Sequence, residues 1–254
     1  MRTRIFSILL IVLLLMTIIP QTAGAQDFNF PDFSFEFSAE GEEEGGADLV
    51  TALRILLLLT VLALAPSIVV MVTSFTRIII VFSIIKRALA IREMPPGQVL
   101  IGLAIFLTVF IMSPVWGHIN QEAIQPYLAE EINTEEALAR SEEPLRSFMF
   151  EQTGEKELSL FVDLSNEERP ETREDIPTYI LIPAFIINEI KVGFQIGFML
   201  YIPFLMIDMI VASILMSMGM LMLPPVIISL PFKILLFVLV DGWYLLIESL
   251  IHTF

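Results

Sequence analysis

The sequence lacks the residues on which most catalytic and redox sites depend. Its 254 residues include no cysteine and only two histidines, which excludes disulfides, thiolate metal sites and cysteine nucleophiles. Neither a phosphate-cradling glycine loop nor an HExxH or GxSxG motif is present. His118 and His252 are isolated at the ends of apolar segments, where a helix terminus is the usual explanation. We therefore expect a protein that is not an enzyme and that needs no cofactor or metal.

Basic residues are also scarce, with 14 Lys and Arg against 29 Asp and Glu. The acids are concentrated in two segments. Residues 27–48 contain eight acids and no base, and residues 117–178 contain sixteen acids and five bases. The rest of the chain is nearly neutral. Because no positive surface is available to neutralise phosphates, we expect no nucleic-acid partner.

Apolar residues, in contrast, make up 56% of the chain, and the mean hydropathy is +0.80. This composition indicates an all-α integral membrane protein. Residues 1–25 have a basic start, an apolar core and a small-x-small site, which predicts a signal peptide cleaved between Ala25 and Gln26; an uncleaved first span is the alternative. Residues 26–48 are predicted to be a disordered acidic tail.

Four long apolar segments follow the predicted signal peptide, and they pair into two helical hairpins, 49–116 and 179–254. The basic stretch between the first two segments places Lys86–Pro96 on the cytoplasmic side by the positive-inside rule. The acidic segment 117–178 and both chain ends would then lie outside, which in a bacterium is the periplasm. The apolar segments are residues 49–72, 97–116, 179–223 and 226–247.

Charged residues within apolar segments are costly unless they face a partner, a cavity or another subunit. They are spread along the segments rather than gathered at one depth, so we expect structural ion pairs between helices or subunits rather than a proton relay. Lys191 and Asp208 are too far apart to pair along one helix. The charges are Arg54, Arg77, Glu189, Lys191, Asp208, Lys233 and Asp241.

Small and helix-breaking residues add a packing prediction. Gly193 and Gly197 form a GxxxG pair, a signal for close helix packing, and Asn188, Lys191 and Gln195 share one helical face. Several prolines should kink or break the helices, because each removes a backbone donor. These prolines are Pro114, Pro183, Pro203, Pro224, Pro225 and Pro231.

A methionine-rich segment, MSMGMLMLPP at 216–225, interrupts the last long apolar stretch. Methionines at every second position would spread around a helix but point to one side of an extended segment. The break at Gly219, Pro224 and Pro225 favours a helix end or a loop. Methionine is flexible and repacks against varied surfaces, so the segment is either ordinary apolar filling or a mobile collar around a pore.

Three long blocks of the sequence, residues 71–89, 95–115 and 182–243, resemble the FliP family of flagellar biosynthetic proteins. The equivalent component of virulence-type type III secretion systems is similar. The resemblance implies a core subunit of the flagellar type III export gate in the bacterial inner membrane, at the flagellar basal body. About five copies would assemble helically with the two other export-gate proteins around a channel for unfolded flagellar subunits.

The resemblance also assigns roles to particular residues. The family's methionine-rich loop, which lines the gate constriction, corresponds here to Met216, Met218, Met220, Leu221 and Met222. Kinked helical hairpins buried against other subunits would place the intramembrane charges at contacts, and the apolar helices need not all cross the bilayer. Two alternatives remain at this point: a proton-coupled transporter using Asp208 and Lys191, and a scaffold whose partners line the pore.

Overall fold

The structure, a computed structural model, describes residues 46–91, 94–165, 170, 172–173, 175–220 and 222–254. The chain divides into two units, Met1–Glu43 and Glu44–Phe254. The described residues fall within the second unit, so the predicted signal peptide with its Ala25–Gln26 cleavage site, and the acidic tail up to residue 45, lie outside them. The described elements are helices only, which confirms the all-α fold class. They are α2 (Gly46–Met71), α3 (Phe75–Ala88), α4 (Gly97–Ile111), α5 (Ser113–Ile119), the π-helix η1 (Asn120–Ile124), α6 (Gln125–Leu128), α7 (Thr134–Gln152), α8 (Glu155–Leu164), α9 (Thr178–Ser217), α10 (Pro225–Leu239) and α11 (Gly242–Ile251).

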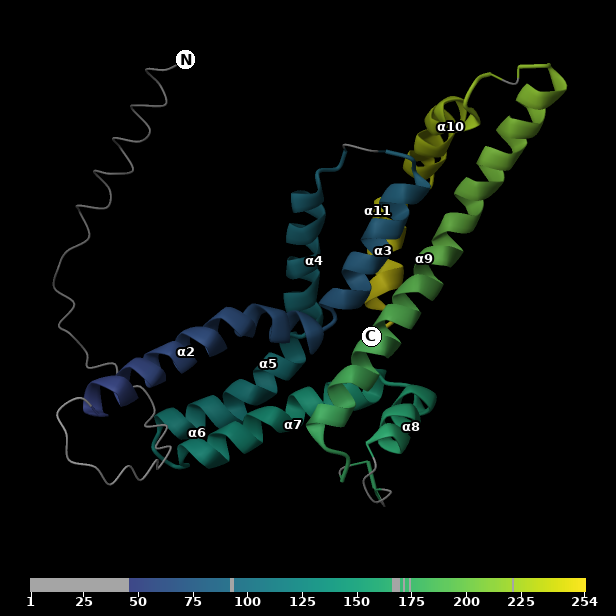
Figure 1. Cartoon of the computed structure of the whole chain (residues 1–254). Helices are drawn as coiled ribbons and strands as arrows, with labels where there is room; N and C mark the ends of the chain where they lie inside the picture. Colours follow the sequence, from purple (N-terminus) through teal and green to yellow (C-terminus); the bar gives the residue numbers. More distant parts are fainter. Residues whose placement is uncertain (1–45, 92–93, 166–169, 171, 174, 221) are drawn as a thin grey trace, which may run out of the picture. The chain divides into compact units, whose positions relative to one another are not determined.

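The longest element is α9, a single helix of 40 residues. At about 1.5 Å per residue it is roughly 60 Å long, about twice the thickness of a bilayer's hydrocarbon core. Figure 1 shows it running from α7 and α8 at one end to the turn before α10 at the other. Only part of α9 can therefore lie within a membrane.

The bends in the chain follow the prolines only in part. Of the predicted kinks or breaks, no break occurs at Pro183 or Pro203, because α9 continues through both. The 53° bend between α4 and α5 does fall beside Pro114. The 63° bend between α10 and α11 falls at Asp241, whose φ of 52° is left-handed. A left-handed residue ends a helix as effectively as a proline, because the next residues leave the helical path.

The centre of the second unit is the contact between α3 and α9. Gly193 and Gly197 lie against Ile80 and Ile84, and a Cβ at Gly197 would stand 2.3 Å from Ile84 Cδ1. The GxxxG pair thus lets α9 approach α3 closely. Around this contact lies an apolar core in which α3 side chains are almost completely buried, among them Ile78, Val81, Phe82 and Ile85.

The acidic segment folds into helices that pack onto the first half of α9. Phe148 and Met149 of α7 share a second apolar core with Leu181 and Phe185 of α9, and the rings of Phe148 and Phe185 meet edge to face at 5.9 Å. Composition alone described this segment as polar. The structure adds that its apolar residues are gathered on the faces of α7 and α8 that contact α9.

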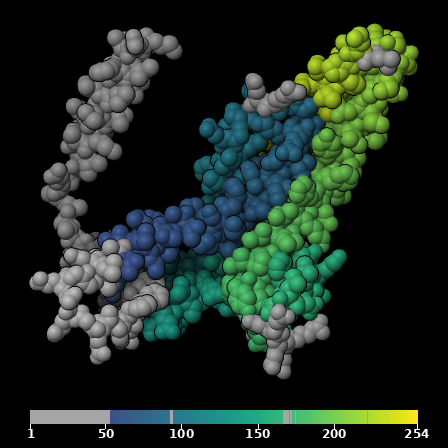
Figure 2. Space-filling view, in the orientation of Figure 1, coloured from purple at the N-terminus to yellow at the C-terminus, as the bar shows by residue number. Residues whose placement is uncertain are grey.

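Two helices, Leu53–Met71 of α2 and Thr178–Ser217 of α9, are long and apolar enough to cross a membrane. The count rises to four if the bent pairs α4 with α5–α6 and α10 with α11 each form one span. α3 falls short of this length and is instead part of the core. Many apolar side chains remain exposed, including those of the second half of α9, the green helix of Figure 2.

Candidate functional site

The methionine-rich segment is the turn between α9 and α10. α9 ends at Ser217 with Met218 as its C-cap, and Gly219 follows with a left-handed φ of 76°. The Met220 N–H donates to the Leu215 carbonyl at 3.0 Å, and the Gly219 N–H donates to the Met216 carbonyl at 3.1 Å. These two bonds form a Schellman motif, in which a glycine at this position ends a helix without steric cost.

Proline opens the next helix. Pro224 is the N-cap of α10 and Pro225 is its first residue, where the missing N–H costs nothing because the first helical N–H groups have no intrahelical partner. The glycine stop and the proline start together fix a short turn at the tip of the α9–α10 hairpin (Figure 1).

The side chains of this turn project into solvent. Met222 is 98% exposed, and Met216 and Met218 are both more than 60% exposed. Met220 is less open, at 41%; Leu221 lies outside the described residues. The four methionines therefore form neither a helical stripe nor an extended row. They crowd around one turn, where flexible thioether chains are free to repack.

Below the turn, a buried ion pair joins the two helices of the hairpin. Lys233 of α10, almost fully buried, lies 2.6 Å from a carboxylate oxygen of Asp208 in α9. Its ammonium also donates to the Ala88 carbonyl of α3 at 3.0 Å, and the Ser229 hydroxyl donates to Asp208. Asp208 thus pairs across the hairpin with Lys233, not with Lys191.

A second buried pair joins α3 to α9. The Arg77 guanidinium forms a two-pronged contact with the Glu189 carboxylate, with Nε 3.1 Å from Oε2. Its other N–H groups reach Gln152 Oε1 of α7 at 2.9 Å and the Thr253 carbonyl at 2.8 Å, and the group lies 3.9 Å from the centre of the Phe254 ring. All five guanidinium N–H donors are used.

The third pair joins α9 to α8. Lys191 Nζ lies 2.8 Å from Glu157 Oε1, and this hydrogen bond lowers the pKa of the Glu157 carboxyl. Of the predicted polar face, Asn188 donates to the Gln152 carbonyl, while Gln195 is exposed. Asp241 forms no ion pair with any described residue and instead holds the left-handed position before α11.

Sequence reasoning missed the partners of these charges. Gln152, Glu157, Thr253 and Phe254 lie in the acidic segment or near the end of the chain, and no spacing rule links them to Arg77 or Lys191. Ser229 was missed as well, although its position four residues before Lys233 places both on one face of α10. Within the described part of the chain, no group of three or more His, Asp or Glu side chains could hold a metal ion.

Comparison with known proteins shows the family to which the chain is related. A model of the FliP family matches residues 58–250. The Bacillus subtilis protein named flagellar biosynthetic protein FliP is 55% identical over 204 residues, which cover 80% of this chain and 92% of the relative. Proteins of the same name from Treponema pallidum (49% identity, 84% and 79% covered) and Borreliella burgdorferi (44%, 89% and 88%) are also similar. The chain belongs to the FliP family of flagellar biosynthetic proteins.

Proposed function

We propose that this protein is a core subunit of the flagellar type III export gate, and that the turn at 216–222 closes the channel through which unfolded flagellar subunits pass. The observation that carries the proposal is the turn itself. It places four exposed methionines at the tip of the α9–α10 hairpin, in a chain whose relatives are named as flagellar biosynthetic proteins.

The physical basis is a hydrophobic gate. A water-filled pore would leak ions, whereas a ring of apolar side chains narrow enough to expel water blocks them. Methionine suits such a ring because its unbranched thioether chain can move aside for a passing polypeptide and then close again. One turn from each of several copies would supply the ring.

Several copies are needed because one turn cannot enclose a channel. We propose a helical assembly of about five copies with the two other export-gate proteins, held in the bacterial inner membrane at the flagellar basal body. The large uncovered apolar surface of α2, α4 and α9 supports contacts with lipid and with other subunits. The flagellar names of the relatives favour this role over the equivalent one in a virulence-type system.

The geometry gives little support to a proton-coupled transporter. Such a path would use Lys191 and Asp208, but each is occupied by a different partner, Glu157 and Lys233 respectively. Ion pairs that join separate pairs of helices act as structural ties more readily than as steps of a relay.

The proposal is tested by replacing the turn methionines with alanine in the assembled gate and measuring ion conductance across the membrane. We expect a clear rise in leak, because alanine leaves the ring too wide to expel water. The control variant replaces three exposed methionines elsewhere on α9, Met199, Met206 and Met209, with alanine. Unchanged conductance together with unchanged export in the turn variant would rule out the gate.

A pore role and a scaffold role differ in what the turn touches. Since the chain has no cysteine, a single Met220→Cys substitution gives a unique cross-linking site. A substrate stalled during export should form an adduct there if the turn lines the channel, and no adduct if partner proteins line it instead.

A further inference from the structure

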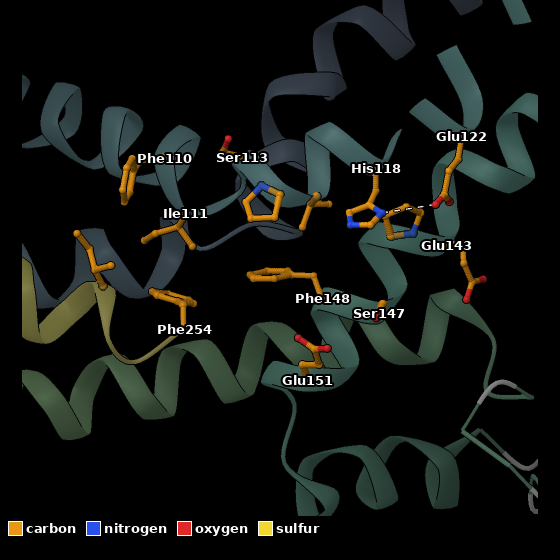
Figure 3. A pocket seen from close by; sticks show the side chains of 14 residues that line it. Phe110, Ile111, Ser113, His118, Glu122, Glu143, Ser147, Phe148, Glu151 and Phe254 are labelled. Carbon is orange, nitrogen blue, oxygen red and sulfur yellow. Dashed lines mark hydrogen bonds and ion pairs between the residues drawn. The ribbon is translucent and has the colours of Figure 1, made fainter. Parts of the chain in front are cut away.

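A groove on the acidic segment has unusual chemistry. It has a volume of about 820 Å³ and lies between the α4–α5 bend, α7 and the end of α11. Its floor is apolar, with Phe110 and Ile111 on one side and Phe148 and Phe254 on another (Figure 3). The carboxylates of Glu143 and Glu151 stand on the α7 side of it.

The acids of α7 differ in whether they pair with a cation. Glu136 and Glu142 each pair with an arginine four residues later. Glu143 and Glu151, eight residues apart and on one helical face, form no ion pair and no side-chain hydrogen bond with any described residue. The groove therefore joins an apolar floor to the carboxylates of Glu143 and Glu151, which lack a cation. The imidazole of His118 also lines it, 3.5 Å from the Glu122 carboxylate.

α2 carries the complementary chemistry. Across Leu53–Met71 it is apolar all round, and none of its membrane-length window is buried. Arg54 lies near its start, exposed and without an ion-pair partner among the described residues. The predicted topology places this lone arginine at the outer end of the span, where basic residues are less common. A carboxylate on that side is therefore a complementary partner for it.

We propose that α2 of one copy of this chain docks in the groove of a second copy, with Arg54 against Glu143 and Glu151. The inference rests on the proposed assembly of several copies. The sequence-based topology places both the start of α2 and residues 117–178 outside the membrane, which makes the contact accessible. A helical turn about 10 Å wide and 5.4 Å long fills about 420 Å³, so the groove accommodates roughly two turns, enough for Arg54, Leu57 and Leu58.

The proposal is tested by cross-linking between two differently tagged full-length chains expressed together in membranes. One chain carries Leu58→Cys and the other Ser147→Cys, a residue that lines the groove. We expect a product that contains both tags. Ser141→Cys, on the same helix but outside the groove, is the matched control and should give little product.

Charge reversal is the second test of the proposed contact. Arg54→Glu, or Glu143→Arg together with Glu151→Arg, should lower the cross-link yield about fivefold, as expected for a loss near 1 kcal/mol at a partly exposed ion pair. Combining the two reversals on opposite chains should restore it. Reversing Glu131 and Glu135 makes the same change of charge at and just before the start of α7, at residues that do not line the groove and that form no ion pair with any described residue, and should leave the yield unchanged.

The outcomes separate this contact from the assembly as a whole. A product that joins only chains with the same tag, or no product while the detergent-extracted complex keeps its oligomeric mass, overturns the docking of α2 and leaves the assembly standing. α2 would then face lipid or another protein. If the complex has the mass of one chain, the proposed assembly fails as well.

Discussion

Removing the charge of Asp208 and removing the charge of Lys233 should lower the free energy of unfolding by different amounts. The Lys233 side chain is 2% exposed, whereas the Asp208 side chain is 22% exposed. Asp208→Asn leaves a buried charge without its counter-ion, which costs about 3–5 kcal/mol. Lys233→Met leaves a carboxylate that water and the Ser229 hydroxyl can still reach, so we expect a loss of only about 1–3 kcal/mol, the cost of an unmade hydrogen bond to a charged group.

The assay is equilibrium unfolding of the detergent-solubilised protein for the wild type, both single variants and the double variant. A difference of about 2 kcal/mol between the single variants is a factor of roughly 30 in the folded-to-unfolded ratio. The double variant should recover most of the larger loss, because no buried charge is left unpaired. If Asp208→Asn proves milder than Lys233→Met, or if the two losses simply add, the burial argument is wrong.

Two further predictions concern packing and pH. Gly197→Ala should lower the melting temperature and reduce the free energy of unfolding by about 1–3 kcal/mol, because the new methyl group overlaps Ile84. Gly102→Ala is the control, since a methyl group there meets no atom within 4 Å. This variant should be neutral or stabilising by up to about 1 kcal/mol. The lowered pKa of Glu157 means that its bond to Lys191 stabilises the fold above the ordinary carboxyl value of 4.5, and that this contribution is lost as the pH falls through the lower folded-state pKa. Unfolding curves between pH 6 and pH 3 should show that loss, and Lys191→Met should remove it; an unchanged slope in the variant would contradict the assignment.

The sequence is a good guide to helices and a poor one to their partners. Long apolar runs gave the positions of α2, α4, α9 and α10, because apolar length and turn residues act locally. α2, for example, spans Gly46–Met71 against a predicted 49–72. The glycine and proline stops at 219, 224 and 225 likewise identified the end of α9, since a left-handed glycine and an N-terminal proline are local requirements.

The partners of the charged residues could not be predicted from local sequence signals. Asp208 and Lys233 are 25 residues apart and Arg77 and Glu189 are 112 apart, so only the folded arrangement brings them together. The bend at Asp241 was also missed, because an aspartate in the left-handed region has no reliable sequence signature beyond a modest preference. The helices of the acidic segment were not predicted either, because its overall composition is polar and does not show that the apolar residues lie on one face of each helix.

The Arg77 site has a consequence for how the protein is made. α3 is synthesised long before the groups that bind its guanidinium, since Glu189 follows 112 residues later and Thr253 follows 176 residues later. During that interval α3 carries an arginine that would cost several kcal/mol in hydrocarbon. We therefore expect the nascent helix to stay at an aqueous surface or against another protein until α9 supplies the Glu189 carboxylate.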